Sequence, residues 1–279
     1  MSLSEHLLLF DSLLSRLQHF ELHKMFWFAT EFNQDLSKWD VTSNASYWEM
    51  FRGAYSFNSD LSSWNTSAGL DFFGIFVGAR SFNGDVTTWD VSNVSPFAGF
   101  GIGISGMFFY ATEFDQDVSG WDVSNHWQLR GVFAEARKFN QDLSTWKIAN
   151  CWDTAHLFMG AESFNQDLCA WKHDFQYAYS RDIFLFSGCT YTEEPVMEQQ
   201  GPFCASMCEI SNKPFQDPLE LHGAIAAYVD QDCANDMDCE IGQAYGYPMN
   251  DWDVSHVVDF SFLFCEYSSS SLCDRGYSP

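Results

Sequence analysis

A block of about 25 residues recurs six times in this 279-residue chain, and no other feature limits its possible folds so strongly. Phenylalanines recur every 25 residues, with one step of 32 in the middle of the series. This column consists of Phe32, Phe57, Phe82, Phe114, Phe139 and Phe164. Tryptophan, aspartate, aliphatic, second phenylalanine and alanine columns keep the same intervals. A unit this short cannot bury its own apolar face, so neighbouring units must stack.

The period predicts an α/β repeat solenoid, a leucine-rich-repeat-like right-handed stack of 25-residue coils with a short parallel sheet on one face. The segment 32–37 alternates apolar and polar residues, which is typical of a strand. The segment 36–44 also fits the leucine-rich-repeat pattern, so the register of the strand stays open. Residues 25–29 and their copies would form a short helical turn on the convex side.

Four regions follow from where the repeat holds and where it breaks. We expect an N-terminal helical cap (1–24), six full repeats with a seventh begun (25–188), a Cys-rich acidic segment (189–247) and the truncated start of a further repeat (248–279). The Cys-rich segment contains one helix signal, with Asp217 as N-cap, Pro218 at the first position and Glu220 completing a capping box. Its apolar face would consist of Leu221, Ala224, Ile225, Tyr228 and Val229.

Composition excludes several classes of protein. Aromatic residues make up 18% of the chain, enough to build a core, so an acidic disordered tail is excluded. The formal net charge of −25 argues against direct binding of nucleic acid or of an anionic membrane, since both need basic patches. The uncharged stretch 91–112 is long enough to span a membrane, but its serines, glycines and proline argue against that.

The cysteines bear on the cellular compartment. None of the nine precedes Cys151, and this clustering predicts disulfides and an extracellular or cell-surface location. Free buried thiols in a cytoplasmic protein are the alternative. Glu5 and Asp11 interrupt the apolar residues of the first twenty, which therefore resemble an amphipathic helix rather than a secretory signal. Glycosylation sequons begin at Asn44, Asn65 and Asn93 and would be used only in a secreted chain.

The repeats carry a family resemblance. The segments MFWFATEFNQDLSKWDVTSN, MFFYATEFDQDVSGWDVSN and LFMGAESFNQDLCAW resemble the BspA-like, mycoplasma-lipoprotein-type leucine-rich-repeat surface proteins. The resemblance covers residues 25–188 and resumes near Trp252. It implies a surface or secreted protein of adhesion or interaction. The chain departs from the family pattern in its Cys-rich segment and in the absence of a recognisable export signal.

Polar columns that alternate with the apolar ones are the candidate ligand-facing residues. They are Asn33, Asp35, Asn58, Asp60, Asn83, Asp85, Asp117, Asn140, Asp142, Asn165 and Asp167. Stacking would bring the aspartates Asp35, Asp60, Asp85, Asp117, Asp142 and Asp167 close together, and calcium would relieve their repulsion. The alternative is that these side chains form hydrogen bonds along the stack or face solvent.

Other motifs fail on context or spacing. Gly101-x-Gly103-x-x-Gly106 matches a dinucleotide fingerprint but lies in the insertion between repeats. The acidic run 230–240 departs from the EF-hand template, and the spacing of Cys204 and Cys208 does not suit zinc. With no catalytic motif, we expect no enzyme and no cofactor. The sequence predicts a non-enzymatic protein that binds a protein or glycan through its polar columns. An acidic spacer without a ligand is the first alternative, and an enzyme built around Cys204 to Cys239 is the second.

Overall fold

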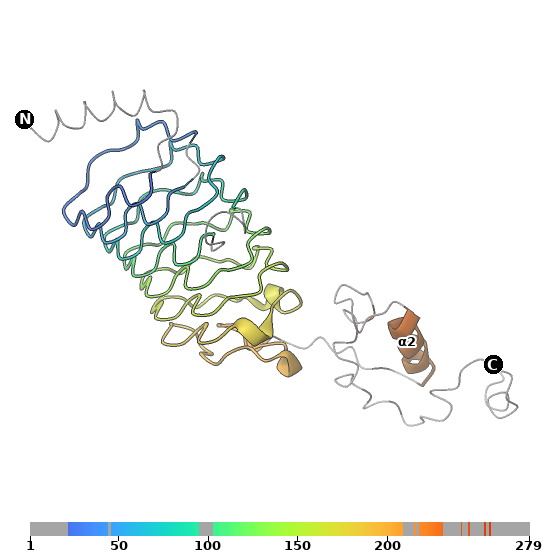
Figure 1. The fold of residues 1–279 in the computed structure, drawn as a ribbon. Helices are drawn as coiled ribbons and strands as arrows, with labels where there is room; N and C mark the ends of the chain where they lie inside the picture. Colours follow the sequence, from blue (N-terminus) through green and yellow to red (C-terminus); the bar gives the residue numbers. More distant parts are fainter. Residues whose placement is uncertain are drawn as a thin grey trace, which may run out of the picture. The chain divides into compact units, whose positions relative to one another are not determined.

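The computed structural model describes residues 22–43, 46–94 and 103–208, the helix α2 (Pro218–Asp230), and the single residues Phe215, Ile241, Tyr245, Val254 and Val257 (Figure 1). The chain divides into two compact units, Met1–Cys208 and Glu209–Pro279. The boundary falls inside the predicted Cys-rich segment 189–247. The predicted N-terminal helix lies outside the described residues, apart from its last three positions. The described helices include none with the length and hydropathy needed to cross a bilayer.

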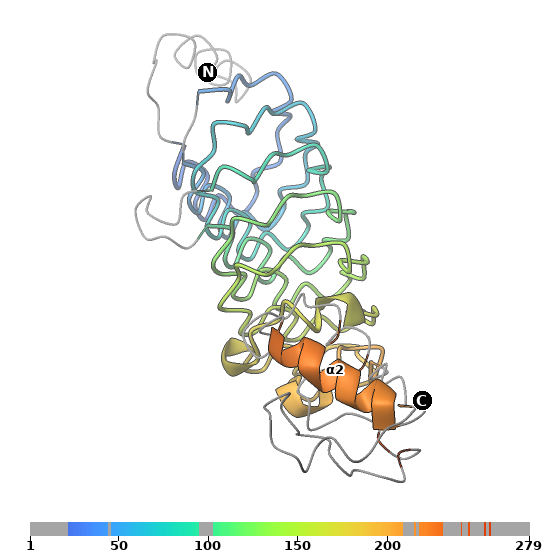
Figure 2. The ribbon, with the colours of Figure 1, turned by 90° about the vertical axis from the view of Figure 1, so that its right-hand side faces the viewer.

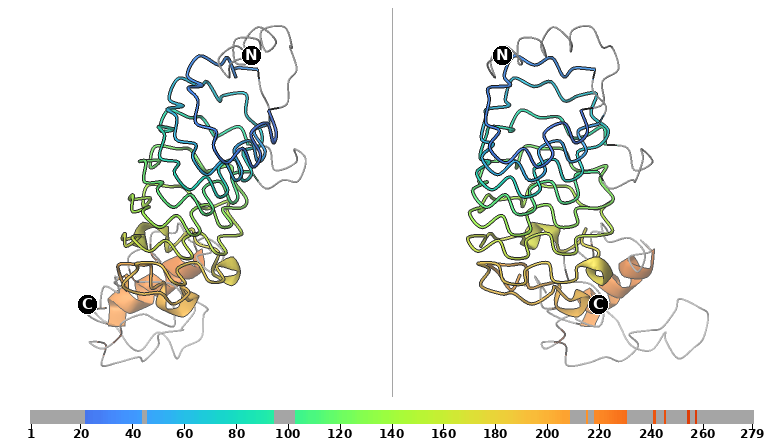
Figure 3. Two further views of the ribbon diagram at one scale, coloured as in Figure 1. Left: turned by 90° about the vertical axis from the view of Figure 1, so that its left-hand side faces the viewer. Right: turned by 60° about the vertical axis from the view of Figure 1, so that its left-hand side comes forward.

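In the first unit, successive coils of chain lie one upon another (Figures 2 and 3). Backbone hydrogen bonds join each coil to the next with a step of about 24 residues. In one coil, four alternate N–H groups donate to the following coil, over distances of 2.7–3.0 Å: Leu129 to Asp153, Gly131 to Ala155, Phe133 to Leu157 and Glu135 to Met159. The N–H groups between them donate within the coil, to the carbonyl three residues earlier, as in Ala134 to Gly131. Every coil therefore contributes a row of tight turns that also forms the ladder.

Left-handed residues explain why this row is neither helix nor strand. Two positions in each coil, four residues apart, have φ between +50° and +71°. The first position is occupied by Lys24, Glu49, Gly74, Gly106, Gly131, His156 and Asp182, and the second by Phe28, Gly53, Gly78, Tyr110, Glu135, Gly160 and Phe186. A left-handed residue breaks both the helical and the extended backbone. The predicted helical turn over 25–29 is therefore wrong.

The predicted α/β solenoid with a parallel sheet is also wrong. The described residues contain α2, three short 3-10 helices and isolated β-bridges, but no strand of a sheet. In the segment predicted as a strand, the N–H of Asn58 donates to the side-chain oxygen Oδ1 of Asn33 at 2.8 Å. A parallel strand would direct that N–H to a backbone carbonyl. Asparagine side chains thus replace the backbone acceptors from which a sheet would be built.

The interior of the stack consists of aligned aromatic rings. The predicted phenylalanine row is confirmed, because the ring centroids of Phe32, Phe57, Phe82, Phe114, Phe139 and Phe164 follow one another at 5.7–6.1 Å. A second row runs beside it, through Phe51, Phe76, Phe108, Phe133 and Phe158, at 5.6–5.8 Å. Within a coil the two rings stack at about 4 Å, as in Phe108 and Phe114 at 3.7 Å. Along each row, nearly parallel rings with centroids 5.6–6.1 Å apart are offset-stacked, an arrangement that stabilises beyond the area buried.

Buried alanines complete each layer of the interior. Ala54, Ala79, Ala111, Ala136 and Ala161 are fully buried, which agrees with the alanine column of the sequence. The seven extra residues of the 32-residue step leave the core in register, since Phe82 and Phe114 stack at 6.1 Å across that step. The insertion is therefore accommodated without opening the stack. Its residues 95–102 lie outside the described part.

Three short 3-10 helices lie at the C-terminal end of the first unit: η1 (Cys169–Trp171), η2 (Tyr177–Tyr179) and η3 (Met197–Gln199). In the second unit, α2 begins at Pro218, as predicted, and has Glu220 in its first turn. Glu220 accepts a hydrogen bond from the Tyr245 hydroxyl at 2.9 Å, while the predicted cap Asp217 lies outside the described residues. Leu221, Ala224 and Tyr228 are buried in a small core with the stacked rings of Phe215 and Tyr245.

Candidate binding surface

The predicted ligand-facing asparagines form a continuous hydrogen-bonded column. Each side-chain Oδ1 accepts the backbone N–H of the equivalent residue in the next coil, over 2.7–3.0 Å. The acceptors are Asn33, Asn58, Asn83, Asp115, Asn140 and Asn165, and the last donor is Thr190. Asp115 belongs to this column although the sequence analysis did not include it. The alternative considered for these side chains, hydrogen bonding along the stack, therefore describes what their oxygens do.

The aspartate column forms hydrogen bonds within each coil rather than between coils. Asp35, Asp60, Asp85, Asp117, Asp142 and Asp167 each accept the backbone N–H two residues later, over 2.8–3.0 Å. These are Asx turns, in which the carboxylate fixes a bend in its own coil. Hydrogen bonds from Ser37 lower the pKa of Asp35, and those from Ser119 lower the pKa of Asp117, because they stabilise the charged carboxylate. The column remains on the surface of the coils.

The calcium candidates do not assemble into a metal site within the described residues. Those residues include no group of three histidine, cysteine, aspartate or glutamate side chains that could hold a metal ion. The six aspartates instead occupy equivalent turns of successive coils. The acidic run 231–240 lies outside the described part. Of the three glycines of the apparent nucleotide motif, Gly103 and Gly106 have φ of +58° and +62° and serve the turns of the coil.

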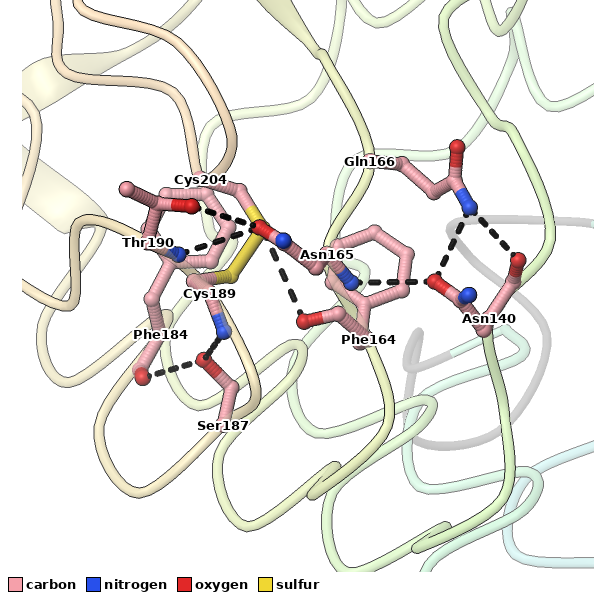
Figure 4. The surroundings of a disulfide bond; sticks show 9 residues. All are labelled: Asn140, Phe164, Asn165, Gln166, Phe184, Ser187, Cys189, Thr190 and Cys204. Carbon is pink, nitrogen blue, oxygen red and sulfur yellow. Dashed lines mark hydrogen bonds between the residues drawn. A yellow bond between two sulfur atoms is a disulfide. The ribbon is translucent and has the colours of Figure 1, made fainter.

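Two disulfides close the C-terminal end of the stack. Cys189 pairs with Cys204, and Cys169 pairs with Cys208, which confirms the prediction of disulfides. Figure 4 shows how the first of these bonds lies beside the asparagine column: Asn165 donates its N–H to Asn140 and accepts from Thr190, the neighbour of Cys189. The loop between the cysteines thus takes the place of a further coil.

The second half of this closing loop adds contacts to the last coil. The N–H of Ala205 donates to the carbonyl of Gln166 at 3.2 Å, and the hydroxyl of Ser206 donates to Oδ2 of Asp167 at 2.9 Å. Cys204 and Cys208 are disulfide-bonded, so they do not offer the thiolates that a zinc site requires. Cys151 is the free cysteine of the described part, and burial raises its pKa to about 12, which keeps the thiol protonated and unreactive.

An exposed aromatic row lies on coils five to seven, and the sequence analysis missed it. Trp127, Trp152 and Tyr179 are 42%, 41% and 55% exposed. Their backbones are neighbours: the N–H of Trp152 donates to the carbonyl of Trp127 at 2.9 Å, and Thr154 donates to the carbonyl of Tyr179 at 3.1 Å. The spacing of 25 residues between Trp127 and Trp152 was the available signal. It did not show whether the rings face inward or outward.

Ion pairs are formed by residues within three positions of these rings in the sequence. Nε of Arg130 donates to Oδ2 of Asp153 at 2.9 Å, and Nε of Arg181 donates to Oδ2 of Asp182 at 3.1 Å. Both arginines are more than half exposed. The rings of Trp152 and Tyr179 meet edge to face, with centroids 5.6 Å apart. We call Trp127, Trp152, Tyr179, Arg130 and Arg181 the aromatic–arginine row.

Comparison with known proteins places the chain in a family. No curated protein and no solved structure matches it significantly. A family model described as "Mycoplasma protein of unknown function, DUF285" matches residues 17–100 and 102–193, which include all six full repeats. The match supports a mycoplasma-type repeat protein, but it does not extend to the leucine-rich-repeat assignment drawn from the sequence. The chain belongs to the DUF285 family of Mycoplasma-type repeat proteins.

Proposed function

We propose that the chain is a non-enzymatic binding protein that presents the outer surface of its coils to a protein or glycan. Support comes from the repetition of that surface: side chains of the same kind are exposed on consecutive coils, held in register by backbone bonds of 2.6–3.3 Å. Repeat proteins of this construction bind through extended surfaces rather than pockets. The register would let one ligand contact several coils at once.

The polar columns also favour a second function. Their oxygens fix turns and join coils, since Asp85 accepts the N–H of Thr87 and Asn58 accepts that of Asn83. The recurrence of these columns therefore has a structural reason without any ligand. An acidic structural or spacer protein would need these columns equally. The two functions differ in whether any partner binds the intact chain.

A paired set of variants tests the proposal. The full chain is applied to a panel of glycans and cell-surface proteins, together with a triple variant Asp85→Asn, Asp117→Asn and Asp142→Asn. Asparagine keeps the Asx-turn acceptor and removes only the charge. The control replaces Asp40, Asp90 and Asp122 by asparagine, since these carboxylates cap the next turn of their coils in the same way.

The outcomes separate the alternatives. Binding by the parent that weakens only in the first triple variant assigns the ligand to the predicted aspartate column. Binding that both variants retain supports the function and moves the site elsewhere on the coils. Absence of binding across the panel, at low and high salt, contradicts the binding function and supports the spacer.

We also propose that the chain works outside the cytoplasm. The support is the pair of disulfides at the end of the stack, because such bonds persist in oxidising compartments. Alkylation of the protein in its native source, before and after reduction, tests this. Four cysteines from positions 169, 189, 204 and 208 should become reactive only after reduction, and their reactivity beforehand would contradict the proposal.

A further inference from the structure

We propose that the aromatic–arginine row binds a neutral oligosaccharide that runs along the stack axis, with one sugar over each coil. This inference rests on the proposed binding function and adds the site and the class of ligand. The apolar face of a pyranose ring stacks on an exposed indole or phenol, whose face carries partial negative charge. Trp127, Trp152 and Tyr179 supply such rings on three successive coils.

The spacing of the coils suits a sugar chain. Interior rings of the coils that carry Trp127 and Trp152 are 5.8 Å apart, as measured between Phe133 and Phe158. This rise is close to the length of one pyranose unit in an extended chain. Tyr179 stands at 86° to Trp152, so its ring meets that indole edge to face at the end of the row. The row thus offers exposed indoles on two successive coils and one further ring at its end.

The charges of the row favour a neutral ligand. Arg130 is neutralised by Asp153, and Arg181 by Asp182. An acidic glycan would have to compete with these carboxylates and approach a chain of net charge −25. Paired guanidinium and carboxylate groups instead offer donors and acceptors side by side, the arrangement that hydroxyl groups require.

The exposed area favours a small ligand over a protein. A buried tryptophan or tyrosine removes roughly 150–250 Å² from water, so three half-exposed rings provide on the order of 300 Å². Stable protein interfaces bury about 800 Å² on each partner. The row is therefore large enough for a short oligosaccharide and too small to anchor a protein alone.

Calorimetric titration of the full chain tests the inference. The probes are linear, uncharged β-linked oligosaccharides of glucose, xylose, mannose and N-acetylglucosamine, each as a disaccharide and a hexasaccharide. One hexasaccharide should bind more tightly than its disaccharide. Trp127→Ala and Trp152→Ala should each weaken it by roughly tenfold or more, because one stacked ring is lost. Trp27→Ala is the matched control, since Trp27 is half exposed on another row.

An oxidation footprint on the parent protein tests the same site without depending on whether the variants fold. N-bromosuccinimide oxidises exposed indoles, and peptide mass spectrometry locates the product. The bound hexasaccharide should protect Trp127 and Trp152 and leave Trp27 reactive. Binding of a protein or an acidic glycan, with no neutral sugar bound, would overturn this inference while the binding function stands. Sugar binding without protection of Trp127 and Trp152 would overturn the site, and no binding of any partner would overturn both proposals.

Discussion

The indole Nε1 of Trp121 donates a hydrogen bond to the carbonyl oxygen of Val86 in the preceding coil, at 3.2 Å. The same bond recurs at equivalent positions over 2.9–3.1 Å: Trp64 to Leu36, Trp89 to Leu61, Trp146 to Val118 and Trp171 to Leu143. Each of these tryptophans is almost fully buried. One side chain therefore fills the interior of its coil and satisfies a buried backbone carbonyl of the coil before it.

Replacing Trp121 by alanine should destabilise the stack by about 3–5 kcal/mol, because a buried ring is lost and a cavity remains. Trp121→Phe should cost less, since it keeps one aromatic ring; it loses the bond to Val86, about 1–3 kcal/mol, and part of the indole volume. Urea unfolding followed by tryptophan fluorescence measures both values. Trp27→Ala serves as the exposed control, and equal stability of Trp121→Ala and Trp27→Ala would show that Trp121 is not part of the core.

A glycine at a left-handed position tests the backbone conformation when an added Cβ would not clash with its neighbours. Gly78 has φ of +69°, and a Cβ added there would meet no atom closer than 3.9 Å. Gly78→Ala should therefore cost about 1–2 kcal/mol from backbone conformation alone. Gly120 has no neighbour within 4 Å and no positive φ, so Gly120→Ala should be neutral or stabilising by about 0.4–1 kcal/mol. Equal unfolding midpoints for the two variants would contradict the turn ladder.

The asparagine column predicts a difference between two substitutions at one site. Oδ1 of Asn58 accepts the N–H of Asn83 at 2.7 Å. Asn58→Ala removes the acceptor and should cost about 0.5–1.5 kcal/mol. Asn58→Asp keeps an acceptor, as Asp115 does at the equivalent position, and should stay close to the parent at pH 7. Thermal unfolding distinguishes them, and a loss in the aspartate variant as large as in the alanine variant would refute the role of Oδ1.

Buried His126 predicts a loss of stability in mild acid. Its Nε2 lies 3.0 Å from the carbonyl oxygen of Val91, and burial lowers its pKa from 6.5 to about 4. Between these two pH values the unfolded chain binds a proton that the folded chain does not. Stability therefore falls as pH drops from about 6.5 to 4, by up to about 3 kcal/mol.

His126→Val is the variant that isolates this effect, because Val94 occupies the equivalent buried position one coil earlier. Urea unfolding at pH 7.5 and pH 4.5 should show a smaller difference in the variant than in the parent. The lowered pKa of Asp117 acts in a separate window, since its stabilisation is present above the ordinary carboxyl pKa and is lost only as pH falls below about 4. An unchanged pH difference in His126→Val would show that His126 does not titrate as described.

The sequence predicted the layers of the interior better than it predicted the backbone. Regular intervals were enough to align Phe57 with Phe82 and to bury the tryptophans, because the repetition of side chains requires equivalent surroundings. The backbone between them depends on local conformation. Non-glycine residues such as His156 and Tyr110 occupy left-handed positions that glycine occupies in other coils. Because no glycine column marks these positions in the sequence, the left-handed turns could not be predicted.

The surface was predicted less well because alternation alone does not distinguish a ligand contact from a turn contact. Asp142 and Asn140 were correctly expected outside the core, yet their oxygens bond to backbone groups. Trp127 and Trp152 each lie two residues before the first N–H of their coil that donates to the next coil, and their outward orientation depends on this position. The repeat period does not reveal the position, whereas the hydrogen bonds between coils do.

Residue-resolved amide hydrogen exchange on the folded chain is the most direct test of the stack. Alternate N–H groups that donate from coil to coil should be protected together, with the same pattern returning about every 25 residues; Phe51, Phe76, Phe108, Phe133 and Phe158 are its central members. The N–H groups of exposed loop residues should exchange freely. Rapid exchange at these five phenylalanines, or protection without the period, would contradict the stacked coils.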